Sequence, residues 1–144
     1  PSTLPDGTQV WYLNGKLHRI DGPAIIEADG KQVWYLNGKL HRADGPAVIC
    51  ANGAQQWYLN GEVHRIDGPA VIGADGTQEW WVNGKVHRID GPAVINPDGR
   101  IAWYRYGRDL TDQVEAWLAE REFPPYGHWS DIQLVEFLVW YSGQ

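Results

Sequence analysis

The sequence predicts a mainly β protein: an elongated single-layer antiparallel meander of β-hairpins, followed by two C-terminal α-helices. Three observations predict this fold. A 23-residue unit repeats without gaps, every copy contains two turn dipeptides, and the hydrophobic spacing becomes helical after residue 107. The chain therefore divides into a repeat sheet over residues 1–107 and a helical cap over residues 108–144.

The repeat has four complete copies, at residues 6–28, 29–51, 52–74 and 75–97, and a partial copy at residues 98–107. The second copy reads DGKQVWYLNGKLHRADGPAVICA. Asn14-Gly15 and its equivalents are typical of a two-residue type I′ turn, in which both residues take positive φ. Asp29-Gly30 and its equivalents join one copy to the next. Because all connections are short, consecutive strands should be antiparallel neighbours, about nine in all.

Each copy also carries an Asp-Gly-Pro-Ala sequence after the hairpin turn. Proline cannot donate a hydrogen bond to a neighbouring strand, so it is expected at a bend. The second strand of each hairpin should therefore be interrupted, which would curve the sheet. The four prolines are Pro23, Pro46, Pro69 and Pro92.

Strand alternation places Trp11 and His18 on one face of the first hairpin and Tyr12 on the other. Equivalent residues of successive copies should then form columns. Because aromatic residues dominate binding hot spots, one column is expected to be a binding surface and the other structural. The candidate binding face consists of Trp11, Trp34, Trp57, Trp80 and Trp103, with His18, His41, His64 and His87 beside them.

Two helices are expected after the last hairpin. Residues 111–121 place Val114, Trp117 and Leu118 at helical spacing, and Ser130 to Gln133 resembles a capping box that opens a second helix. These helices should cover the edge of the last strand, whereas the N-terminal edge near residues 8–13 should be uncovered. Alternatively, one helix docks a partner or completes a dimer.

The junction of sheet and helices is a second candidate binding site, because the regular repeat ends there. Its candidate residues are Tyr104, Tyr106, Trp117, Trp129 and Trp140.

The pattern of Trp11, Asn14-Gly15, Lys16 and His18 resembles the MORN repeat family. Arg19 and the following Asp-Gly-Pro-Ala depart from that family's usual glycine. The variant WYxNGxxHRxDGPA is similar to repeats found mainly in uncharacterised bacteriophage and bacterial proteins. The resemblance covers about residues 6–106. It implies an elongated sheet with a protein-binding or scaffolding role, of which a phage-encoded inhibitor of a host defence protein is one form.

Composition narrows the expected partners. A net charge of −6 does not favour nucleic acid or an anionic membrane, so a protein partner is expected. The single cysteine, Cys50, forms no disulfide framework, and a reduced, cytoplasmic location is expected, in the host cell if the protein is phage-encoded. No cofactor or metal is expected, because equivalent histidines two strands apart are separated by about 9–10 Å.

His18, Arg19 and Asp21 form the sequence that most resembles a catalytic group, since an imidazole beside a carboxylate can act as a general base. The sequence occurs in four copies, however, whereas an active site is usually singular. We therefore expect no enzyme: each histidine should bond a neighbouring copy, and each arginine should pair with an aspartate at the bend. The alternatives are a nucleotide- or sugar-binding, sequestering or hydrolytic protein, and a structural protein that self-assembles or dimerises through a free edge or the C-terminal helices.

Overall fold

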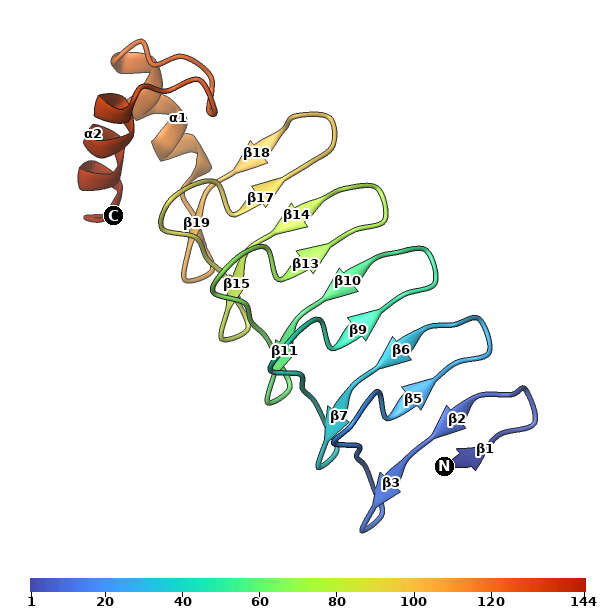
Figure 1. Cartoon of the computed structure of the whole chain (residues 1–144). Coiled ribbons are helices and arrows are strands. Elements are labelled where there is room, and N and C mark those ends of the chain that lie inside the picture. The colour runs from blue at the N-terminus through green and yellow to red at the C-terminus, as the bar shows by residue number, and fades with distance from the viewer.

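The computed structural model describes residues 1–144 and confirms a mainly β fold with two C-terminal helices. In Figure 1 the copies follow one another as steps of an elongated array, with both helices at its C-terminal end. Every strand is two residues long. The array is therefore held together by short, repeated backbone contacts.

The main sheet is a meander of ten antiparallel strands that runs the length of the array. In spatial order its strands are β1 (Ser2–Thr3), β2 (Gln9–Val10), β5 (Ile25–Ile26), β6 (Gln32–Val33), β9 (Val48–Ile49), β10 (Gln55–Gln56), β13 (Val71–Ile72), β14 (Gln78–Glu79), β17 (Val94–Ile95) and β18 (Ile101–Ala102).

Five separate hairpins project beside this sheet, one from each copy. They pair β3 (Tyr12–Leu13) with β4 (Lys16–Leu17), β7 (Tyr35–Leu36) with β8 (Lys39–Leu40), β11 (Tyr58–Leu59) with β12 (Glu62–Val63), β15 (Trp81–Val82) with β16 (Lys85–Val86), and β19 (Tyr104–Arg105) with β20 (Arg108–Asp109).

The expected count of about nine long strands differs from these twenty short ones, because both strands of each repeat are interrupted. The predicted break at Asp-Gly-Pro-Ala is confirmed between β4 and β5. A second break, which was not predicted, falls at the tryptophan. The Trp11 N–H donates to Ala24 O at 2.8 Å, while Trp11 O accepts from the His18 N–H at 3.1 Å. Trp11 therefore bonds to the main-sheet side of the copy through its N–H and to the hairpin side through its carbonyl oxygen. The chain bends at this residue.

The hairpin turns follow the prediction. Asn14 and Gly15 have φ of 51° and 77°, as a type I′ turn requires. Across the turn Leu13 pairs with Lys16 and Tyr12 with Leu17.

Successive hairpins are joined by three hydrogen bonds. Arg19 N donates to Tyr35 O at 3.2 Å, and Gly38 N donates to Leu17 O at 2.8 Å. The third bond runs from Asn37 N to His18 Nδ1 at 3.0 Å, which confirms that the repeated histidine bonds the neighbouring copy.

The N-terminal edge differs from the expectation. β1 pairs with β2, with Ser2 opposite Val10 and Thr3 opposite Gln9, so the main sheet has no open edge at residues 9–10. The first six residues turn back on the chain, which the repeat pattern could not indicate. The β3–β4 hairpin, as the first of the five, has no preceding hairpin to bond to.

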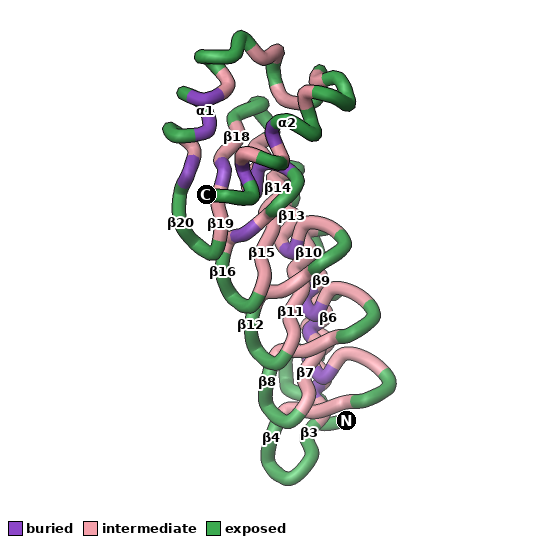
Figure 2. The backbone as a smooth tube through the Cα atoms, turned by 90° about the vertical axis from the view of Figure 1, so that its left-hand side faces the viewer, coloured by how far each residue is buried: buried purple, intermediate pink, exposed green.

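Buried residues form a line along the array and a larger cluster where the helices meet the last copy (Figure 2). Helices α1 (Thr111–Glu120) and α2 (Asp131–Tyr141) pack on that copy, and the capping box of Ser130 and Gln133 is confirmed. The cluster consists of Trp103, Leu110, Val114, Trp117, Phe137 and Tyr141. The C-terminal segment is therefore a cap with a core of its own.

Along the array the buried positions include one alanine per copy, each fully buried, at Ala24, Ala47, Ala70 and Ala93. Backbone bonds place each of them between the tryptophan of its own copy and the strand of the next. We expect Ala47→Leu to lower the free energy of unfolding by about 1–3 kcal/mol through overpacking, measured by chemical denaturation. Ala43→Leu is the matched control, because Ala43 is exposed and other copies have isoleucine there. An equal loss in both variants would contradict this packing.

Candidate binding face

The face of the array that carries the tryptophans, here called the Trp face, is organised by arginine. The Arg19 guanidinium carbon lies 3.9 Å from the ring centroid of Trp11, and the next three copies repeat this at 3.9–4.0 Å. Arg19 also donates to Asp21 at 2.9 Å and to Pro23 O at 3.2 Å. The expected arginine–aspartate pair is confirmed. The predicted column is not a stack of indoles; each of these four tryptophans packs instead under its own arginine.

Three open hollows lie in a row on the Trp face, one between each pair of successive complete copies, with volumes of 720, 540 and 540 Å³. The first is lined by Trp34, Leu36 and His41 and walled by the bends at residues 19–23 and 42–44. The second and third repeat this arrangement around Trp57 and Trp80. Neighbouring hollows share a wall, so the row is continuous.

The walls present apolar side chains at positions that sequence reasoning missed. Ile20 is 87% exposed, Ile66 83% and Ile89 62%. Each stands between the arginine and the aspartate of its bend. The sequence does carry a signal for this surface: an isoleucine lies inside the otherwise polar Arg-x-Asp-Gly-Pro turn. The bend itself does not require an apolar residue at that position.

The walls also present negative charge. The Arg19 side chain is only 23% exposed, whereas that of Asp21 is 85% exposed, so a ligand meets mainly the carboxylate. The hydrogen bond from Arg19, and then its charge, lower the pKa of Asp21 below its ordinary value of 3.8, and Arg65 acts in the same way on Asp67. These carboxylates are therefore ionised at neutral pH.

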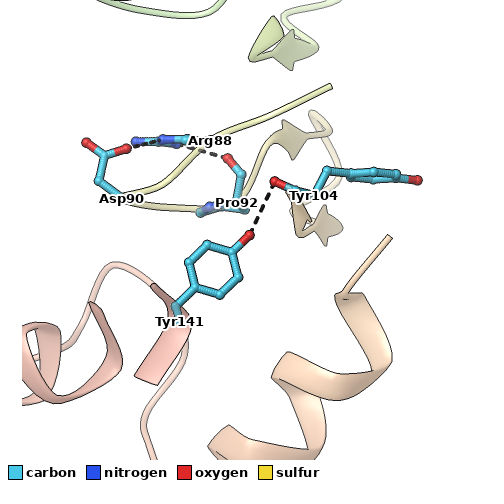
Figure 3. Close-up of polar contacts among 5 residues, drawn as sticks. All are labelled: Arg88, Asp90, Pro92, Tyr104 and Tyr141. Carbon is cyan, nitrogen blue, oxygen red and sulfur yellow. Dashed lines mark hydrogen bonds and ion pairs between the residues drawn. The ribbon is translucent and has the colours of Figure 1, made fainter. Parts of the chain in front are cut away.

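A fourth hollow would lie between the bend at residues 88–92 and Trp103, but the cap fills it. Tyr126 and Tyr141 both lie with their ring centroids 5.7 Å from that of Trp103. Figure 3 shows the Tyr141 hydroxyl donating to Tyr104 O, at 3.3 Å. Three equivalent positions on the array are thus open and one is occupied by the chain itself.

The candidate residues of the Trp face therefore separate into two groups. Trp34, Trp57 and Trp80 line the hollows, and Trp11 lies at the outer end of the row. The inclusion of Trp103 was wrong, because its side chain is fully buried under the cap. The histidines are mainly structural: His18, His41 and His64 are half-buried with Nδ1 bonded to the next copy, and His87 is buried.

The candidate residues at the sheet–cap junction belong mostly to the cap core. Trp117 is buried, and Trp129 and Trp140 pack against the same cluster. Tyr104 is half-buried and bonded to Asp109, while Tyr106 is exposed and stacks on His87 at 4.0 Å. The expected surface at this junction is therefore largely absent, since these rings pack on one another.

His87 couples the fourth copy to the fifth, because its Nδ1 accepts from Tyr106 N at 2.9 Å. Burial, and then the charge of Arg105, lower the pKa of His87 below its ordinary value of 6.5. The neutral imidazole therefore stabilises the fold above about pH 6.5, and this contribution is lost as the pH falls through the lowered folded-state pKa. We expect the melting temperature to fall less in His87→Gln than in the wild type between about pH 7 and pH 5. Identical pH profiles would contradict this role.

The four His-Arg-x-Asp sequences do not form His–Asp pairs. Asp21 bonds Arg19, while His18 Nδ1 bonds a backbone N–H. No group of three or more histidine, cysteine, aspartate or glutamate side chains lies together as a metal site would require.

Neither helix has the length and apolarity needed to cross a bilayer.

Comparison with protein-family models gives no match, and a search of curated proteins likewise gives none.

Proposed function

We propose that this protein is a non-catalytic binding module, in which the repeat array acts as a scaffold and the three open hollows receive a protein partner. The observation that carries the proposal is the row itself: the same hollow recurs three times, between walls whose isoleucines are 62–87% exposed. Single exposed apolar residues are ordinary, but their recurrence beside a row of hollows, at three walls of four with Ala43 at the other, is typical of an interaction surface.

A polypeptide fits this face better than a nucleotide or a sugar. A nucleotide base or a sugar would stack face to face on an indole, but an arginine already lies over one face of Trp11, Trp34, Trp57 and Trp80 at 3.9–4.0 Å. A small ligand would also use one hollow, whereas the row extends over four copies. An inhibitor of a host defence protein, encoded by a phage, is one form of this function, and that form rests on the resemblance of the repeat alone.

The proposal predicts that Ile66 contributes to binding, because it stands on the wall shared by two hollows. Ile66→Lys should abolish recovery of a partner from a bacterial lysate, while the fold is retained. Ile132→Lys is the matched control, since Ile132 is 80% exposed but lies on α2, away from the row. The measurement is a pull-down with the wild type and both variants, with the folded state checked by circular dichroism.

Equal recovery by Ile66→Lys and the wild type would count against the Trp face. A thermal shift of several degrees with a nucleotide or sugar at submillimolar concentration would instead favour small-ligand binding. Light scattering at two protein concentrations separates both functions from self-assembly, for which the mass would rise with concentration.

A further inference from the structure

The fourth hollow is filled by aromatic side chains of the cap, and these indicate what kind of group suits the other three. One of them, Tyr126, lies against the bend and follows Pro124 and Pro125 in a segment without helix or strand. Gly91, Pro92 and Trp103 are buried there, whereas their equivalents Gly68, Pro69 and Trp80 are only half-buried beside the third hollow. A tyrosine preceded by prolines therefore covers one hollow of this type within the chain.

The tyrosine hydroxyl shares with the arginine of its bend a space that glycine leaves open, since a Cβ on Gly91 would also lie 2.7 Å from the guanidinium carbon of Arg88. The Tyr126 hydroxyl oxygen lies 2.8 Å from the position that a Cβ on Gly91 would take, so a side chain there would collide with it. Equivalent glycines line the three open hollows, at Gly22, Gly45 and Gly68. A Cβ at each of them would lie 2.9–3.0 Å from the guanidinium carbon of the arginine in the same bend, so the backbone and the arginine beside each open hollow are arranged as at Gly91.

The spacing of the hollows fits one backbone conformation. Equivalent positions lie two strands apart, which is about 9.6 Å. A polyproline II segment rises about 3.1 Å per residue with three residues per turn, so every third side chain recurs on one face at about 9.3 Å. In a β-strand, residues three apart point to opposite faces. In an α-helix, the nearest matching spacing is seven residues, or about 10.5 Å, which falls out of step along the row.

We propose that the partner presents a proline-rich segment in the polyproline II conformation, with a tyrosine at every third position, and that this segment lies along the array with successive tyrosines in successive open hollows. The inference rests on the proposed protein-binding function and specifies the partner's chemistry. The exposed carboxylates of Asp21, Asp44 and Asp67 on the walls favour positive charge on the segment beside them.

Two synthetic peptides of equal composition test the proposal. One contains three Pro-Pro-Tyr triplets, the other has its three tyrosines adjacent after the prolines, and both carry lysine at each end and a fluorophore. Titration with the full chain, followed by fluorescence anisotropy, should show the triplet peptide binding at least about tenfold more tightly. Ile66→Lys and Ala43→Lys, on the two walls between hollows, should each weaken that binding about tenfold, and Ile132→Lys should not change it.

Equal affinity for the two peptides, no binding of either, or binding that is insensitive to both wall variants would overturn this inference. The pull-down from bacterial lysate distinguishes failure of the polyproline II proposal from failure of the proposed binding function. If the peptides fail but partner recovery still depends on Ile66 and not on Ile132, the segment is of another kind and the Trp face is still the binding surface. If recovery is also independent of Ile66, both proposals are wrong.

Discussion

Trp103→Ala is expected to lower the free energy of unfolding by about 3–5 kcal/mol, because it removes the largest fully buried side chain. The Trp103 side chain is fully buried, and its ring meets Tyr126, Trp129, Phe137 and Tyr141. Removal of the indole leaves a cavity between the last copy and the cap that rigid aromatic neighbours cannot fill. Equilibrium denaturation, followed by circular dichroism, measures the loss.

Two variants make this result specific. Trp80→Ala removes the equivalent, half-buried indole of the preceding copy and should cost less. Trp103→Phe should also cost less than alanine, because phenylalanine retains most of the packing and removes an indole Nε1 that is buried without a hydrogen-bond partner. Equal losses at positions 80 and 103 would mean that the cap does not pack as described.

Arg105→Ala is expected to have the second largest effect, a loss of about 2–3 kcal/mol. Arg105 Nη1 donates to the carbonyl oxygens of Tyr141 at 2.7 Å, Ser142 at 2.9 Å and Gln144 at 3.3 Å. These carbonyls lie at the C-terminal end of α2, where the helix dipole favours a positive charge. The variant leaves them without this donor, so the last turn of α2 should separate from the sheet.

Hydrogen exchange measures this effect locally. The backbone amides of residues 138–144 should exchange faster in Arg105→Ala, while those of the first three copies keep the wild-type rates. Arg108→Ala is the control, because Arg108 pairs with Arg105 in the same hairpin but is exposed, and its side chain makes no hydrogen bond or ion pair. Unchanged protection at the end of α2 would show that Arg105 does not hold the cap.

The sequence predicted the features that depend on near neighbours. The type I′ turns follow from Asn-Gly, the bend follows from Pro23, and the pairing of Arg19 with Asp21 follows from their separation by two residues. The break at Trp11 was not predicted, because it depends on two bonds to different segments. The Trp11 N–H donates to Ala24 O, and Trp11 O accepts from the His18 N–H.

The structure explains why the fifth copy departs from the repeat. Arg105 stands where other copies have leucine or valine, and it holds α2. Thr111 Oγ1 accepts the Trp103 N–H at 3.0 Å, a role that the carbonyl of Ala24 has for Trp11 in the first copy. The beginning of α1 therefore replaces the missing second half of the fifth copy. In the sequence, Arg105 and Thr111 indicate only that the 23-residue repeat ends.

Trp103 was assigned to the surface because the period alone makes it equivalent to Trp80. The residues that bury it come from 23 to 38 positions further along the chain, in the cap, and periodicity carries no information about such contacts. The open hollows were missed for a related reason. A hollow forms between two copies, whereas the repeat pattern describes the residues of one.

Site-specific crosslinking tests most directly whether the row of open hollows is the binding surface. A photoreactive side chain is placed at position 66, on a wall between hollows, or at position 132, on α2, and each protein is irradiated in a bacterial lysate. If the row of open hollows is the binding surface, position 66 should give a discrete adduct and position 132 should give none. An adduct from position 132 alone would place the partner on the cap and contradict this account.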